Sequence, residues 1–284
     1  MKNTVSTEII GNISDIRLKI KDFRKKRLEI GLVPTMGALH AGHETLIKRA
    51  KTECDAVIVS IFVNPIQFGP NEDFAKYPRQ MELDREICSK YGVDLIFAPT
   101  EKELYPEDDL TMVIPPDFYQ NKLCGSLRAG HFNGVVTVVS KLFNIITPDK
   151  AYFGQKDAQQ FFIIKKMVKD LNFPVELIVC PVVRESDGLA YSSRNKYLDE
   201  NARKKAPCLY QALECIREAY ESGDNLFSQI KKEAEQKFLY DIDVEYFAAV
   251  DVENFKDVEE LKSGILIAIA AKVGSTRLID NLIL

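Results

Sequence analysis

The chain has 284 residues, of which 46% are hydrophobic, and this is enough apolar material for one large domain or for one large domain with a small satellite. The formal net charge of −4 excludes the global basic field with which nucleic-acid binders capture phosphate backbones. The N-terminal segment lacks the apolar run of a signal peptide and no stretch reaches the length of a membrane span, so we expect a cytoplasmic protein without nucleic-acid or membrane partners.

Strand-like apolar runs alternate with amphipathic helical segments through the first part of the chain. The runs are residues 28–35, 56–65, 94–100, 151–154 and 175–183. Between them, apolar residues recur at three- and four-residue spacing in 43–53, 77–92, 132–146 and 157–172. Near-continuous apolar runs indicate strands that are buried on both faces. The alternation therefore predicts a Rossmann-like α/β domain over residues 1–183, with a parallel sheet and right-handed crossovers.

The residue pattern of the chain changes after Pro181. A polar junction is followed by a charged helical stretch over about residues 200–239 and by short strands around 243–251, 265–273 and 276–284. This pattern predicts a smaller α+β domain over residues 184–284. The junction, PVVRESDGLAYSSRN, is typical of a hinge whose Ser and Arg side chains can swing toward a ligand.

The cysteines are scattered and form no CxxC pair, so the sequence favours buried thiols over a zinc site or a disulfide framework. They stand at Cys54, Cys88, Cys124, Cys180, Cys208 and Cys215. We expect no metal bound by a dedicated set of protein ligands.

The segment PTMGALHAGH holds two of the three histidines and follows the first predicted strand of the α/β domain. Ligands of open α/β folds bind where such strands pass into helices. Gly37 and Gly42 allow close approach of the backbone, and His40 and His43, three residues apart, can both donate to phosphate oxygens. The alternative is a surface histidine beside a packed one. Metal binding is disfavoured because the nearest third ligand, Glu44, points to another side of the helix.

HAGH resembles the HxGH signature of the nucleotidyltransferase superfamily. Further segments narrow the resemblance to the pantoate–beta-alanine ligase family, from about residue 28 to the C-terminus: PTMGALHAGH, VSIFVNPIQFG, YPR, RAGHFNGVVTVVSKLF, YFGQKDAQQ, DGLAYSSRNKYL and STRLIDN. The resemblance implies that ATP activates pantoate as a pantoyl adenylate, with release of pyrophosphate, and that the amine of β-alanine then displaces AMP to give pantothenate. It also implies Mg²⁺ with the ATP co-substrate, and a homodimer.

The resemblance implies roles for particular residues. His43 is the principal catalytic group, with His40 and Lys156. The ATP-binding residues are Met36, Gly37, Ala38, Leu39, His40, Ala41, Gly42, His43, Gly154, Gln155, Lys156, Asp157, Val183, Tyr191, Ser192, Ser193 and Arg194. Pantoate and β-alanine are assigned to Asn64, Gln67 and Gln160. Two alternatives stay open: Gln160 as a solvated helical residue, and Asp157 as a helix cap. In the same reading, residues 1–183 bind ATP and pantoate and residues 184–284 form a lid.

Some positions depart from the family pattern. Gln155 stands where Glu is frequent, Tyr191 where a smaller or aliphatic residue is usual, and Ala129 where RPGHF has proline. His131 is left without a catalytic role, since it fits a packing residue at a helix start equally well. The density of glycines around it, at Gly125, Gly130 and Gly134, predicts a mobile flap that keeps water from the adenylate.

Two other functions remain open. One is a different adenylyltransferase of the same superfamily, acting on nicotinate mononucleotide or phosphopantetheine and releasing a stable dinucleotide. The other is a nucleotide-binding regulatory protein without turnover. The presence of both histidines with Lys156 and Arg194 argues against the second.

Overall fold

The computed structural model describes residues 6–70, 72–238 and 242–284. The chain divides into two compact units, and each is described here by itself. Unit 1 comprises Met1–Pro115, Arg128–Gly154 and Ile163–Cys180, and unit 2 comprises Pro116–Leu127, Gln155–Phe162 and Pro181–Leu284. This division differs from a single boundary at residue 183, because two short segments that precede that residue associate with the C-terminal part.

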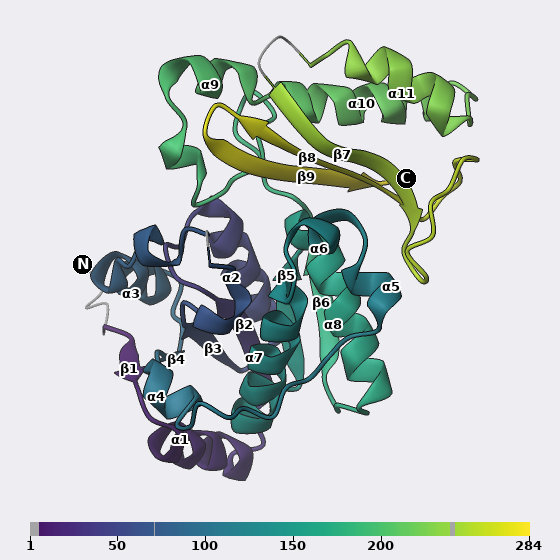
Figure 1. The fold of residues 1–284 in the computed structure, drawn as a ribbon. Coiled ribbons are helices and arrows are strands. Elements are labelled where there is room, and N and C mark those ends of the chain that lie inside the picture. Colours follow the sequence, from purple (N-terminus) through teal and green to yellow (C-terminus); the bar gives the residue numbers. More distant parts are fainter. Residues whose placement is uncertain (1–5, 71, 239–241) are drawn as a thin grey trace. The chain divides into compact units, whose positions relative to one another are not determined.

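Unit 1 contains a six-stranded parallel sheet, in the order β1-β4-β3-β2-β5-β6 (Figure 1). Its strands are β1 (Glu8–Ile10), β2 (Ile30–Thr35), β3 (Ala56–Ile61), β4 (Leu95–Phe97), β5 (Lys150–Gly154) and β6 (Glu176–Cys180). The strand order reverses at β2, which pairs with β3 on one side and with β5 on the other. This is the topological switch point at which ligands bind in open α/β sheets. The predicted fold class is confirmed.

Burial explains which strands the sequence pattern revealed. All six residues of β3 are buried: Val57 and Val59 pack in one cluster with Ile47 of helix α2 (Ala41–Glu53), and Ile58 on the other face is fully buried. The edge strand β6 is more open, with Val179 37% exposed, although its apolar run predicted a strand buried on both faces. Pairing along one side only leaves part of that edge accessible.

Helices connect these strands. They are α1 (Ile13–Lys25), α2, α3 (Met81–Lys90), α4 (Glu101–Leu104), α7 (His131–Ile146) and α8 (Ala158–Asp170), with the 3₁₀ turns η1 (Pro65–Gln67) and η2 (Phe74–Lys76). Strand β1 and helix α1 were not predicted, although Ile13, Ile16 and Ile20 carry helical spacing. The Asn12 side chain caps α1 by accepting from the Asp15 amide.

Unit 2 contains a three-stranded antiparallel sheet of β7 (Ile242–Asp251), β8 (Ile265–Val273) and β9 (Thr276–Ile283), in that order. The predicted helical stretch 200–239 is divided into α9 (Glu200–Lys205), α10 (Cys208–Glu221) and α11 (Phe227–Glu235). Pro207 stands at the N-cap of α10, and Gly223 follows the helix with a φ of +102°. Leu213 and Ile267 are fully buried in the shared core.

Gln159 joins the two short segments to each other, and the Tyr119 hydroxyl joins them to the C-terminal part by donating to the Glu253 carbonyl at 2.6 Å. The Gln159 amide nitrogen donates to the carbonyls of Tyr119 and Lys122, both at 2.8 Å, and its oxygen accepts from the Cys124 amide at 3.0 Å. The short helices α5 (Asp117–Gln120) and α6 (Leu123–Leu127) are thereby fixed to the start of α8.

The cysteines of the described residues are free thiols. Five are buried, as predicted, and Cys215 is half-buried. Burial raises the pKa of Cys88 and that of Cys208 to about 12. Within the described ranges, no helix is both long and apolar enough to span a membrane.

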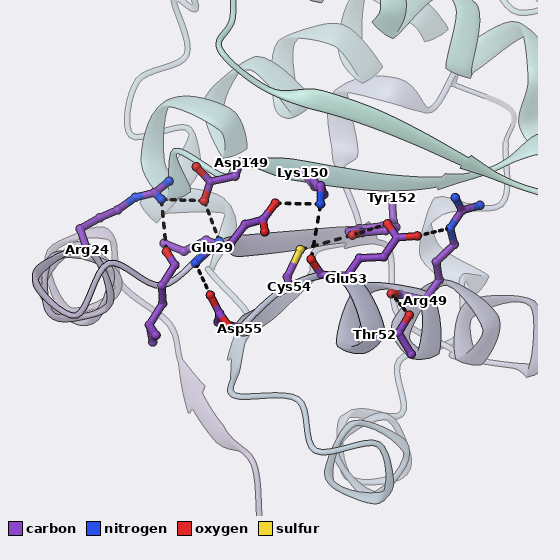
Figure 2. A network of polar contacts seen from close by, with 12 residues as sticks. Arg24, Glu29, Arg49, Thr52, Glu53, Cys54, Asp55, Asp149, Lys150 and Tyr152 are labelled. Atoms are coloured by element: carbon purple, nitrogen blue, oxygen red, sulfur yellow. Dashed lines mark hydrogen bonds and ion pairs between the residues drawn. The ribbon is translucent and has the colours of Figure 1, made fainter.

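Figure 2 shows a polar network where strands of the unit 1 sheet begin. Asp149, just before β5, accepts from Arg24 at 2.6 Å and from the Ile30 amide of β2 at 2.7 Å. Glu29 pairs with Lys150 at 2.8 Å. These contacts join the first residues of neighbouring strands. They therefore lie at the opposite end of the strands from the loops that follow β2 and β3.

Candidate active site

The loop Met36–His40 connects the carboxyl end of β2 to α2, which begins at Ala41 rather than near His43. His40 is the N-cap of this helix. Its Nδ1 accepts from the Gly42 amide at 3.2 Å, and His43 Nδ1 accepts from the His40 amide at 3.3 Å. The ring centroids lie 4.1 Å apart. The sequence-predicted pair is therefore brought together at a helix N-terminus, where backbone amides favour an anion.

These cap contacts determine where each imidazole carries its proton. Since Nδ1 accepts a backbone hydrogen bond in both His40 and His43, each ring in its neutral form is protonated at Nε2. An Nε2–H group is a hydrogen-bond donor suited to a phosphate oxygen. Sequence reasoning predicted donation from this pair but not the tautomer.

Asp84 of α3 binds the backbone of the loop Met36–His40, and the sequence analysis did not identify it. Its carboxylate oxygens accept from the Ala38 amide at 2.9 Å and from the Leu39 amide at 2.8 Å, and the side chain is buried. Gly37 has a φ of +80°, and a Cβ there would lie 2.9 Å from the Asp84 carboxylate. The helical register of Asp84 with Cys88, four residues later, is a sequence signal for burial but not for the amides that it binds.

Asn64 and Gln67 follow the buried strand β3, as predicted, and both are buried. Asn64 Nδ2 donates to Gln67 Oε1 at 3.0 Å and to the Gly134 carbonyl at 3.1 Å, and Asn64 Oδ1 accepts from the Tyr105 hydroxyl at 2.8 Å. Gln67 Nε2 in turn contacts Met36 Sδ at 2.9 Å. Three predicted site residues, from the loops after β2 and β3, thus form one connected group.

His131 supports the same group from α7. The Arg128 guanidinium can only donate, so His131 Nε2 accepts from it at 2.9 Å and His131 Nδ1 donates to the Gln67 carbonyl at 2.7 Å. Arg128 also forms a bidentate pair with Glu72, at 2.7 and 2.5 Å. Burial alone would raise the pKa of Glu72, but the bonds and charge of Arg128 lower it overall. His131 therefore holds the backbone of the turn η1 at Gln67.

Close packing explains two glycines that the sequence assigned to a mobile flap. A Cβ at Gly134 would lie 2.4 Å from the Ile66 carbonyl oxygen, and one at Gly125 would lie 1.9 Å from the Gln120 carbonyl oxygen. Both glycines stand inside helices, α7 and α6. They allow backbones to approach closely, so their presence is no sign of mobility.

Apart from Gly154, which ends the last stretch of unit 1 before residue 155, the remaining predicted residues lie in unit 2 on two segments. The junction forms a small hairpin in which Arg184 bridges to Ala190 and the Tyr191 amide donates to the Val183 carbonyl at 3.0 Å. In the turn that follows, the Arg194 amide donates to Ser192 Oγ at 3.2 Å, and Ser193 is half-buried.

The second segment follows β5. Gly154 ends the strand, and the 3₁₀ turn η3 (Gln155–Asp157) carries a half-buried Lys156 and an exposed Asp157. Gln160 lies in the first turn of α8 and is half-buried.

Comparison with known proteins places this arrangement in a family. A family model described as pantoate-beta-alanine ligase matches residues 8–283. The chain belongs to this family. The family resemblance found in the sequence motifs is confirmed, and the chain is an enzyme of the ligase class, not a regulatory protein without turnover.

Curated relatives of this family match along almost the whole chain. Pantothenate synthetase from Caldicellulosiruptor saccharolyticus is 48% identical over 277 residues, which cover 97% of this chain and 98% of that protein. Pantothenate synthetase from Clostridium botulinum is 50% identical over 275 residues, covering 96% of this chain and 98% of that protein.

Solved structures agree with the fold. The crystal structure of pantothenate synthetase from Thermus thermophilus has a TM-score of 0.93 at 42% identity, covering 97% of this chain and 99% of that one. Pantoate-beta-alanine ligase from Francisella tularensis, complexed with beta-gamma ATP and beta-alanine, has a TM-score of 0.80 at 38% identity, with 98% of each chain covered.

Proposed function

We propose that this chain condenses pantoate with β-alanine to form pantothenate, converting ATP to AMP and pyrophosphate through a pantoyl adenylate. The observation that carries the proposal is the pair of imidazoles, His40 and His43, whose Nδ1 atoms accept backbone hydrogen bonds at the N-terminus of α2 after the switch-point strand. Membership of the ligase family and a relative complexed with ATP and β-alanine support it.

The proposed chemistry follows from the poor reactivity of a carboxylate as an acyl donor. Attack of the pantoate carboxylate on the α-phosphorus forms the mixed anhydride and releases pyrophosphate. Attack of the β-alanine amine on the acyl carbon then releases AMP. Charge develops on the α-phosphate oxygens in the first step, and donors such as His43 Nε2–H stabilise it there.

The other predicted residues take roles in the same proposal. Asn64, Gln67 and Gln160 bind pantoate, since their amides can donate to a carboxylate and accept from hydroxyls. Lys156 and Arg194 neutralise the β- and γ-phosphates, with hydroxyl donation from Ser192 and Ser193. The proposal assigns ATP binding to the segments 36–43, 154–157 and 191–194 and to Val183.

Mg²⁺ belongs to the proposal as a companion of the ATP phosphates. The part of the chain that the structure describes contains no cluster of three or more His, Cys, Asp or Glu side chains that could hold a metal ion. In the proposal, the cation is held mainly by phosphate oxygens and water. When bound, it offsets the charge of the departing pyrophosphate.

A pyrophosphate exchange assay tests the order of the steps. The purified protein, given ATP, Mg²⁺ and pantoate but no β-alanine, is expected to incorporate labelled pyrophosphate into ATP, and addition of β-alanine is expected to give AMP and pantothenate. ADP as the product, or full turnover without exchange, would overturn the adenylate. A stable dinucleotide product would indicate a different adenylyltransferase.

Gln67→Ala tests the pantoate assignment in the same assay. We expect the KM for pantoate to rise more than the KM for ATP, because an amide that fixes the acceptor is lost. Unchanged pantoate kinetics would remove Gln67 from the proposed site.

A homodimer, which the family resemblance implies, and a cytoplasmic location, which the sequence pattern favours, also belong to the proposal. Light scattering coupled to size-exclusion chromatography measures the oligomeric state directly. A mass equal to one chain at assay concentrations would contradict the homodimer.

A further inference from the structure

Asn281 connects the last strand of unit 2 to the turn that carries Lys156. Its side-chain Nδ2 donates to the carbonyl oxygens of Gln155 and Lys156, both at 2.9 Å. The residue is 3% exposed and lies in β9, paired in register with Ala268 of β8. One buried amide group thus contacts two successive carbonyls of the turn η3, directly before α8 begins.

The strand that carries Asn281 is itself held at this point. The neighbouring Asp280 is buried. Its carboxylate accepts from the Arg184 guanidinium at 2.5 and 3.0 Å and from the backbone amide of Asn281 at 2.8 Å. Arg184 lies over the Tyr210 ring at 4.1 Å and donates to the Gly188 carbonyl at 3.0 Å. Paired charges with several additional hydrogen bonds form a rigid support in a buried setting.

We infer that Asn281 is a positioning residue for the proposed reaction, acting through Lys156. Lysine supplies a point charge on a flexible stem, so its delivery to a phosphate depends on where the backbone of the turn is fixed. Loss of both amide donors removes the two hydrogen bonds that hold these carbonyls to β9 and allows the turn to shift. The inference rests on the proposed function, because it assumes that Lys156 acts on the phosphates of ATP.

A double-mutant cycle tests this inference. Asn281→Asp keeps the shape of the side chain but replaces the donor by an acceptor facing two carbonyls. We expect kcat for AMP formation to fall by about 10²-fold, because misplacement of a catalytic group by about 1 Å has this effect, while the KM for pantoate stays within about twofold. In a Lys156→Ala background, Asn281→Asp is expected to lower kcat by no more than about threefold further, because its effect acts through the missing lysine.

Asn254→Asp is the matched control. It makes the same substitution in unit 2, at an exposed asparagine whose Oδ1 accepts from the Lys256 amide, a role that aspartate retains. Its kinetics should equal those of the unchanged protein. Where Asn281→Asp does not give a cooperative unfolding transition, Asn281→Ser, which retains one donor, takes its place, and an intermediate loss of kcat is expected.

Four outcomes separate the hypotheses. Wild-type kcat in a folded Asn281 variant, or effects of the two substitutions that multiply in the cycle, would overturn the positioning role. A rise in the KM for pantoate equal to the fall in kcat would also overturn it. Absence of AMP formation by the unchanged protein would instead overturn the proposed function.

Discussion

His40 and His43 accept backbone hydrogen bonds at the atom nearer the chain, so the farther nitrogen of each neutral ring carries the proton. The arrangement combines two tasks, because the rings cap α2 and present donors at its N-terminus. A substitution that retains the cap but lacks the second nitrogen can separate the two tasks.

His43→Ala is expected to lower turnover by about 10²-fold or more, since one donor aimed at transition-state charge is lost. His43→Asn is the informative companion, because its Oδ1 can accept from the His40 amide in place of Nδ1 while Nε2–H is missing. We expect it to be as slow as His43→Ala in the pyrophosphate exchange assay. Recovery of most of the activity in His43→Asn would show that only the cap matters.

Glu72 gives a prediction for acid stability. Its pKa is lowered in the folded protein, so its stabilising contribution is complete above the ordinary value of 4.5 and is lost as the pH falls through the lower folded-state value. We expect Glu72→Gln to reduce the free energy of unfolding at neutral pH by about 1 to 3 kcal/mol. Urea unfolding measured from about pH 7 to pH 3 should show this difference shrinking with acidification. A difference independent of pH would contradict the ion pair as its source.

At the scale of elements, α7 packs directly on the turn η1 that carries Gln67. Gly134 makes this possible because it has no side chain, and its carbonyl accepts from Asn64. The helix thus determines the position of the proposed pantoate ligands by a contact between backbones.

Gly134→Ala should displace η1. The added Cβ meets the Ile66 carbonyl at 2.4 Å, so we expect a loss of about 1 to 3 kcal/mol in stability together with a raised KM for pantoate. The measurements are urea unfolding and initial rates at varied pantoate. Gly11→Ala is the control, because its Cβ would meet only the Ala98 carbonyl at 3.5 Å. Equal pantoate kinetics in both variants would contradict this account.

The elements of the site were predictable to the extent that they follow from local pattern. Buried apolar runs located β2 and β3, and the rule that ligands lie at strand ends located His40, His43 and Gln67. The supporting residues were not predictable in this way, because each is distant in sequence from the group it holds. Asp84 is 45 and 46 positions from the amides it binds, and Asn281 is 125 and 126 positions from the carbonyls to which it donates.

For the whole molecule, the sequence predicted a sheet domain followed by a smaller α+β domain but placed one cut between them. The chain instead contributes 116–127 and 155–162 to unit 2. The contacts that join these two segments to each other come from Gln159, a single polar side chain in an otherwise regular helical pattern. Composition and periodicity carry no signal for such a contact.

The polar network of Figure 2 lies where strands of the unit 1 sheet begin, whereas the loops after β2 and β3 lie where those strands end. Stability and catalysis should therefore be separable. Asp149→Ala removes the acceptor shared by Arg24 and the Ile30 amide. We expect a loss of about 1 to 3 kcal/mol in the free energy of unfolding, with kcat and KM unchanged in the folded protein. Altered kinetics at temperatures where the variant is folded would contradict this separation.

Alkylation of the buried cysteines can measure how often each unit opens transiently. Only a thiolate reacts with an alkylating reagent, and a pKa of about 12 at Cys88 reduces that form at neutral pH by about a thousandfold relative to an unfolded chain. Alkylation of Cys88 therefore requires α3 to leave the core, and α3 is the helix that carries Asp84. Mass spectrometry of labelling at Cys88 and Cys208, with and without ATP, would give a separate opening rate for each unit, and nucleotide held by the loop that Asp84 anchors should slow labelling at Cys88.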